Sequence, residues 1–139
     1  MKTFEQIEME VRAYDMLNNM MHECANDMLG VGIPVHPEQV KNIHIGTVKG
    51  SRAACFYRMG ADARYAFIIS IDKGFLKHMD NNAVMANVKE SMYHELLHTC
   101  DGCQTHNAAF LEISTASSRQ ICNKSSSTSS AVATTSFSA

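Results

Sequence analysis

The residues with the clearest chemical potential lie in one short stretch, in which His94, Glu95 and His98 follow one another on a segment that reads as a helix. Histidines four positions apart project from the same face of a helix, so both imidazoles can bind one metal ion. This H-E-x-x-H spacing is typical of zinc peptidases, in which the glutamate handles the proton of a water on the metal. The motif predicts zinc ligands at His94 and His98 and a catalytic carboxylate at Glu95.

A third ligand is expected downstream, because a catalytic zinc usually takes three protein ligands and leaves the fourth position to water. We predict His106 for this role, since a turn through Asp101-Gly102 can end the helix and return the chain to the metal. Glu112 is an alternative third ligand, as in zinc peptidases that use a glutamate. A different alternative is a non-catalytic zinc module whose closed site is completed by Cys100 or Cys103.

The cysteine count and the N-terminal sequence point to a reducing compartment. Five cysteines are an odd number, and Glu5, Glu8 and Glu10 interrupt the region where a signal peptide needs an apolar segment. No run of eighteen apolar residues occurs, so no membrane span is predicted. We expect a cytoplasmic protein with free thiols, in which Cys100 and Cys103 serve as packing or turn residues. A redox or accessory-metal role for this C-x-x-C pair is the alternative.

The segment from Val84 to Phe110 also resembles a known family. The string H-E-L-L-H, seven further residues, His106 and then an aromatic at Phe110 is similar to the SprT-like metallopeptidases, and most of all to their short bacterial and phage members. The similarity to Spartan, a DNA-dependent protease among the eukaryotic relatives, is more distant. The metzincin pattern is excluded, because it needs histidine where this chain has Gln104.

The resemblance implies a zinc metallopeptidase that acts on a protein or peptide substrate. Its zinc ligands would be His94, His98 and His106, and its catalytic glutamate would be Glu95. It also implies that the sheet edge beside the zinc-binding helix holds the substrate backbone as an added strand. The sequence does not indicate which strand forms that edge.

The remaining elements predict an α+β fold on the minimal zincin plan, with an N-terminal helix packed on a three-stranded, mainly antiparallel sheet and then the zinc-binding helix. Thr3 and Gln6 form a capping-box pattern before a continuous apolar stripe. Short turns suggest that the strands follow one another as hairpins. The stripe comprises Phe4, Ile7, Val11, Tyr14, Leu17, Met21, Cys24 and Met28, and the predicted strands are 43–49, 52–59 and 64–71.

Charge is distributed unevenly along a chain whose net charge is only −2. Residues 41–77 carry seven basic side chains against two acidic ones. If the basic side chains share a face, they can attract phosphate, so a weak DNA association through this segment is a second reading of the protein's role. A solvated sheet face is the simpler explanation of the same pattern.

The C-terminal residues depart from the pattern of the family. Residues 111–139 contain ten serines and four threonines and show no apolar stripe. Such a composition buries too little surface to offset its ordering entropy. We therefore divide the chain into a metallopeptidase domain over residues 1–110 and a disordered tail over residues 111–139.

Overall fold

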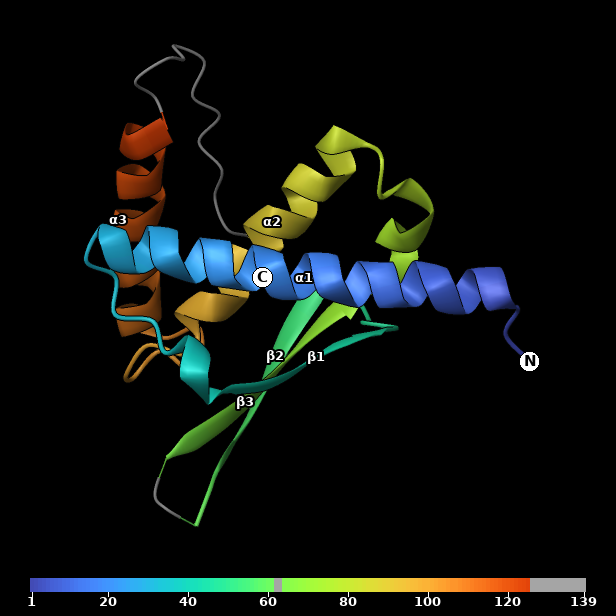
Figure 1. Ribbon diagram of the computed structural model, residues 1–139. Coiled ribbons are helices and arrows are strands. Elements are labelled where there is room, and N and C mark those ends of the chain that lie inside the picture. Colours follow the sequence, from blue (N-terminus) through green and yellow to red (C-terminus); the bar gives the residue numbers. More distant parts are fainter. Residues whose placement is uncertain (62–63, 126–139) are drawn as a thin grey trace.

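The computed structural model describes the backbone of residues 1–61 and 64–125, and the side chains of those residues up to 116. The predicted α+β class is confirmed: a long helix, three strands and two further helices follow in order (Figure 1). The helices are α1 (Phe4–Gly30), α2 (Asn82–Leu97) and α3 (Ala108–Ser125), the strands are β1 (Val40–Gly46), β2 (Ala53–Met59) and β3 (Tyr65–Asp72), and the short 3-10 turns are η1 (Pro37–Gln39) and η2 (Lys73–His78).

The predicted start of α1 is confirmed. The Thr3 hydroxyl accepts from the Gln6 amide at 3.1 Å, and the Gln6 side chain accepts from the Thr3 amide at 2.8 Å, which completes the capping box. After Gly30 the chain turns through Gly32, whose φ of +86° suits glycine, and the Ile33 amide returns to the Met28 carbonyl at 2.9 Å.

The predicted apolar stripe of α1 is buried only in its second half. Leu17, Met21, Cys24 and Met28 lie in the core. Phe4, Ile7 and Val11 are instead 76%, 48% and 57% exposed. In Figure 1 the N-terminal turns of α1 extend to the right of the sheet, which explains why this end of the stripe has little to cover it.

The sheet differs from the predicted series of hairpins. Its strand order is β1-β3-β2, so β3 is central and both other strands are edges. The β2–β3 hairpin is antiparallel as predicted, but β1 pairs with β3 in parallel, with Ile43 opposite Ile69. Asp72 explains the first connection: its carboxylate accepts from the Val48 amide at 3.0 Å, and its own amide donates to the Arg52 carbonyl at 2.8 Å. The chain therefore crosses the end of β3 instead of folding back on β1.

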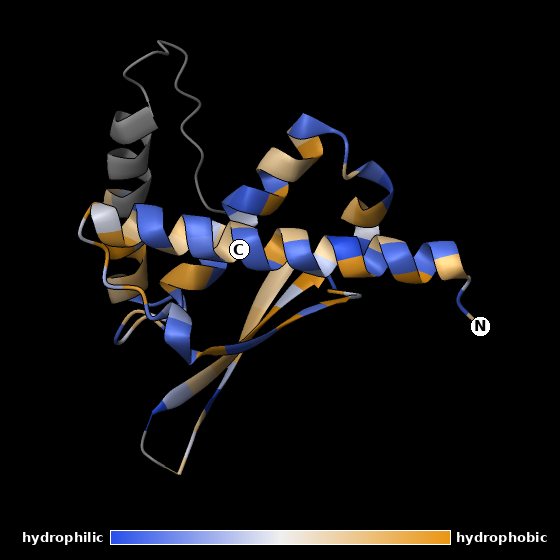
Figure 2. Cartoon of the chain, in the orientation of Figure 1, coloured by the Kyte–Doolittle hydropathy of each residue, from blue (hydrophilic) through white to orange (hydrophobic). Residues whose placement is uncertain are grey.

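One face of the sheet carries the core. Phe67, Ile69 and Ile71 alternate along β3 and are buried on this face. The helices α1 and α2 pack against each other over it, α1 contacting β1 and α2 contacting β2, and the buried apolar residues of both helices belong to one core. Figure 2 shows apolar residues recurring between polar ones along both helices. On the other face, Phe56 and Ile68 are paired across the hairpin and exposed. The helical layer over β2 is the one that carries the predicted metal ligands.

The end of the chain differs from the predicted tail. Residues 111–125 continue α3, which begins at Ala108, although no helix was expected there. Phe110 is buried and Ile113 packs partly against the core, so two anchors one turn apart hold the start of a helix whose sequence is otherwise serine-rich. The part of the predicted tail from residue 126 onward lies outside the described residues. The division of the chain at residue 110 stays a prediction.

Among the described residues, no helix combines the length and the apolar character that crossing a bilayer requires.

Candidate metal centre

The helix α2 carries His94 and Glu95 near its C-terminal end, and His98 is its C-cap residue. Its first turn is capped by the Asn81 side chain, which accepts from the amides of Ala83 and Val84 at 3.0 and 3.2 Å. Val88, Met92 and Leu96 then recur every fourth position and are buried, which fixes the rotation of the helix. His98 is the C-cap residue and keeps helical φ/ψ values, so its side chain still lies one turn beyond His94.

The chain returns from α2 to the metal centre through a hydrogen-bonded turn. The Thr99 hydroxyl donates to the Leu96 carbonyl at 2.7 Å and accepts from the His36 amide at 2.8 Å, which ties the turn to the segment before β1. Gly102 has a φ of +77°, and the Cys103 amide donates to the Cys100 carbonyl at 3.0 Å. The predicted turn at Asp101-Gly102 is thus confirmed, and His106 follows it.

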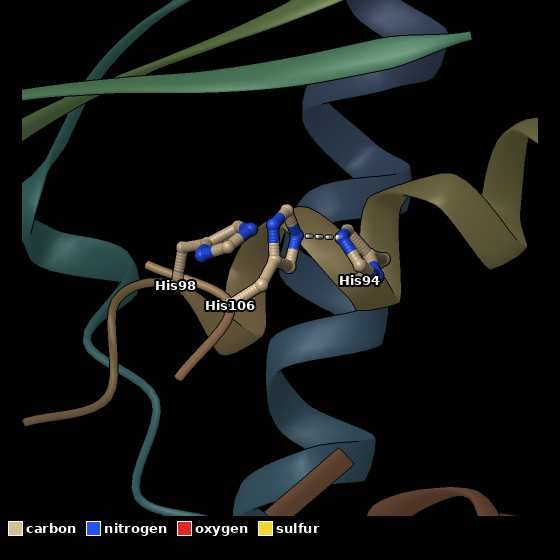
Figure 3. Close-up of side chains that lie close together, drawn as sticks. All are labelled: His94, His98 and His106. Atoms are coloured by element: carbon tan, nitrogen blue, oxygen red, sulfur yellow. Dashed lines mark hydrogen bonds between the residues drawn. The ribbon is translucent and has the colours of Figure 1, made fainter. Parts of the chain in front are cut away.

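Three imidazoles converge at this point (Figure 3). One nitrogen each from His94, His98 and His106 lies within 4.8 Å of the other two. The Nε2 atoms of His94 and His106 are 3.2 Å apart. Two nitrogens bound at about 2.0–2.1 Å to one tetrahedral ion are separated by about 3.4 Å, so the spacing of this pair is compatible with two ligands of one small metal ion. The three histidines form a group that can hold a metal ion.

The protonation of His98 is fixed by its surroundings. Its Nδ1 lies 2.9 Å from the Cys103 carbonyl oxygen, which can only accept a hydrogen bond, so Nδ1 carries the proton. Burial lowers the pKa of His98, with a smaller lowering from His106, and the bond to Cys103 opposes both. The ring is therefore neutral at neutral pH, with the Nε2 lone pair free to bind a metal.

Glu95 is buried beside the two helix histidines. It is only 4% exposed, and its two carboxylate oxygens lie 4.0 Å from Nε2 of His94 and 4.0 Å from Nε2 of His98. Burial raises the pKa of Glu95 to about 8 in the metal-free protein. A carboxylate at this distance is not one of the three candidate ligands, but it would lie within reach of a water bound to an ion that the three rings held.

Phe110 supports all three imidazoles from α3. Its ring stacks on His98 with centroids 4.5 Å apart and an interplanar angle of 14°. It meets His94 and His106 edge to face, at 5.1 and 4.9 Å between centroids. Because Phe110 is buried, these contacts limit the rotation of the rings and hold them over one point. The start of α3 is in turn capped by Asn107, whose side-chain oxygen accepts from the Phe110 amide at 2.9 Å.

A cavity of about 280 Å³ opens above the histidines, and β2 forms its opposite wall. The strand contributes Ala53, Ala54 and Cys55, and Ser51 precedes them at the rim. Burial is the main cause that raises the pKa of the Cys55 thiol to about 12, and the Glu95 charge adds to it. The sequence did not single out these residues. The only signal would have been the strand pattern itself, because the pairing that makes β2 an edge beside α2 is not local.

The other residues considered as ligands lie elsewhere. Among the described residues, the one cluster suited to a metal contains the three histidines, with neither Glu112 nor a cysteine. Cys100 and Cys103 are buried free thiols, as predicted for packing and turn residues. Tyr93, the neighbour of His94, donates from its hydroxyl to the Asp27 carboxylate on α1 at 2.9 Å and points away from the metal centre.

No protein-family model, curated protein or solved structure matches the chain. The likeness to the SprT-like metallopeptidases therefore rests on the residues between Val84 and Phe110 alone.

Proposed function

We propose that the protein is a zinc-dependent metallopeptidase of the SprT-like kind, which hydrolyses peptide bonds of protein substrates. The observation that carries the proposal is the placement of Glu95 beside three converging imidazoles at the floor of a cavity that opens to solvent. A site built to stabilise the fold closes its coordination with a fourth protein ligand. Here the fourth side faces the cavity and a carboxylate.

The ligand set favours zinc. Neutral imidazoles suit zinc among the common divalent ions, and three protein ligands with one open position are the usual arrangement of catalytic zinc. When bound, zinc polarises a water and a peptide carbonyl and lowers the pKa of that water to about 7. His98 is prepared for this role by its bond to the Cys103 carbonyl, which keeps Nε2 deprotonated.

Glu95 is the general base and acid of the proposed reaction. Its oxygens lie 4.0 Å from the Nε2 atoms of His94 and His98, so a water between the rings and the cavity is within reach of the carboxylate. Glu95 accepts the proton that this water releases as the water attacks the peptide carbonyl. It then delivers that proton to the amine that leaves when the C–N bond breaks.

The free edge of β2 is the binding surface for the substrate backbone. The Asp72 amide bonds to the Arg52 carbonyl and the Gly60 amide bonds to the Arg64 carbonyl, so every second residue between them faces β3. The backbone groups of Cys55 and Tyr57 therefore point outward along the edge, and Cys55 also lines the cavity. An extended peptide added here passes over the three histidines.

Two alternatives have less support. A closed four-ligand module needs a cysteine at the metal, and the group of ligands contains none among the described residues. A DNA-associated role through residues 41–77 stays a prediction, which salt-dependent binding to single-stranded DNA would test.

The experiment compares three variants in zinc content and in digestion of casein. Glu95→Gln keeps the shape of the side chain, so zinc is retained while cleavage falls by about 10²–10⁴-fold. His94→Ala loses both zinc and cleavage. Glu90→Gln, a matched control on the same helix, changes neither. Full cleavage by the Glu95→Gln variant contradicts the proposed role of Glu95.

A further inference from the structure

A second cavity lies next to the candidate metal centre along α2. It encloses about 180 Å³, and its walls include Ile71 from β3, Phe75 from η2, and Val84 and Val88 from α2. Arg52 and Ser91 also line it. An apolar cavity of about 150 Å³ holds a benzene molecule, so this space accommodates one aromatic or branched aliphatic side chain.

Neighbouring residues line the two cavities on both the strand side and the helix side. On the strand side, Arg52 lines the second cavity, and its neighbours Ser51 and Ala53 line the cavity over the histidines. On the helix side, Ser91 lies one turn before Glu95, on the same side of α2. A peptide bound along this cleft therefore meets the second cavity directly after it passes the metal centre.

The direction of β2 sets which part of a substrate reaches this cavity. The second cavity lies at the N-terminal end of β2, where the Arg52 carbonyl marks the start of the strand. A peptide added antiparallel to β2 places its C-terminal residues at that end. The residues that follow the scissile bond then lie over the second cavity. This step rests on the proposed function.

The two charged side chains that line the cavity, Arg52 and Asp72, have opposite signs, so the cavity offers no net charge to an occupant. Both carboxylate oxygens of Asp72 accept backbone hydrogen bonds, from Val48 and from Gly74, each at 3.0 Å. Arg52 is exposed and forms no ion pair within the part of the chain that the structure describes. With no net charge to attract an ion, the apolar walls decide, because a lysine or arginine side chain placed against them would lose its hydration.

We propose that this second cavity binds the apolar side chain of a substrate residue on the carboxyl-terminal side of the scissile bond, and so determines cleavage preference. Leucine, isoleucine, methionine and phenylalanine are the side chains of suitable size. Val84 is half-buried at the wall, so a larger side chain at this position fills the cavity without disturbing the metal ligands three turns away.

The test digests a peptide library with zinc-loaded protein and identifies the cleavage sites by mass spectrometry. We expect leucine, isoleucine, methionine or phenylalanine to be enriched at one of the first two positions after the scissile bond. The Val84→Trp variant should lower kcat/KM for such peptides by at least about 10-fold and shift the preference to glycine and alanine. Ala86→Trp, at an exposed position of the same helix that does not line the cavity, is the control. An unchanged preference in Val84→Trp overturns the proposal.

A binding measurement separates failure of this proposal from failure of the proposed function. An uncleaved leucine-containing hexapeptide is added to the zinc-loaded Glu95→Gln variant, and amide shifts are followed by NMR. We expect shifts at Gly74, Asn87 and Ser91 that disappear when Val84→Trp is added. If the wild-type protein cleaves nothing but these shifts occur, the peptidase proposal fails and the cavity still binds apolar side chains. If these amides do not shift, the cavity proposal is wrong.

Discussion

The two halves of the candidate metal centre are held in different ways. The helix half comprises His94, Glu95 and His98, which are buried and carried by α2. The loop half comprises residues 99–107, and its ligand His106 is exposed and follows a turn closed by a few hydrogen bonds. The folded core positions the helix half whether or not a metal is present. The loop half has less packing behind it, so metal binding should stabilise it most.

Phe110 joins the two halves, and its removal should have the largest effect on stability. The ring is buried against all three imidazoles, so Phe110→Ala should lower the free energy of unfolding by about 3–5 kcal/mol and weaken zinc binding. Urea unfolding of the metal-free and zinc-loaded variants measures both effects. Leu111→Ala, at the exposed neighbouring position, should change stability by less than about 0.5 kcal/mol. Equal losses in the two variants would show that the ring does not support the site.

His98 and His106 provide the most direct contrast between the halves. Both alanine variants should lose at least about 100-fold in zinc affinity, because each removes one of three ligands. In the metal-free protein, His98→Ala should cost about 2–4 kcal/mol, since it leaves a cavity against Phe110. His106→Ala should cost less than about 0.5 kcal/mol, because the residue is exposed. Thermal unfolding in the presence of chelator measures the stability of both variants. Similar losses of stability in His98→Ala and His106→Ala would contradict the distinction between the two halves.

The titration of Glu95 tests whether solvent is excluded from the helix half. Burial raises the pKa of Glu95 to about 8 from its ordinary 4.5. Between these values the metal-free folded state keeps a proton that the unfolded state has released. Its free energy of unfolding should therefore fall as pH rises, by up to about 1.4 kcal/mol per pH unit, and level off above pH 8.

The Glu95→Gln variant should lack this slope, and Glu90→Gln should retain it. Urea unfolding at several pH values between 5 and 9 in chelator measures the slope in all three proteins. A wild-type stability that is flat over this range would mean that solvent reaches the carboxylate.

Gly102 in the loop half and Gly32 in the turn after α1 both have positive φ, so the same substitution can be compared at the two positions. This comparison has the smallest expected effect. Gly102 has a φ of +77° and Gly32 one of +86°, and nothing lies within 4 Å of an added Cβ at either position. Alanine at each should cost about 1–2 kcal/mol through the backbone alone. Only Gly102→Ala should also weaken zinc binding, because it distorts the turn that delivers His106. Calorimetric titration with zinc measures the affinity of each variant. Equal zinc affinities of the Gly102→Ala and Gly32→Ala variants would mean that the loop can still place His106 at the metal.

Local patterns made the helix half predictable. The four-residue spacing of His94 and His98 depends only on neighbours in sequence, and the structure places them one helical turn apart, as expected. The turn at Gly102 followed from its glycine, and the convergence of His106 followed from ligand-count rules. The identity of the metal and the reaction stay predictions.

The features that the sequence did not reveal depend on distant contacts. The parallel pairing of Ile43 with Ile69 is not encoded in the turn lengths, so β1 was wrongly placed beside β2. The edge position of β2, and hence its place at the cavity, followed from that pairing. Phe4 on α1 fits the apolar stripe but lies where the sheet does not reach. The serine-rich composition of residues 111–125 gave no sign of α3, which begins at Ala108 and is held to the core by the buried Phe110.

The central claim is that one divalent cation binds to His94, His98 and His106 and leaves a side open toward Glu95. Anomalous diffraction at the zinc edge from crystals of the zinc-loaded protein tests it most directly. We predict a single strong peak at about 2.0–2.1 Å from one nitrogen of each of the three rings, with a solvent molecule as the fourth neighbour. A peak bound by Cys100 or Cys103, or no peak among the three histidines, would contradict the account.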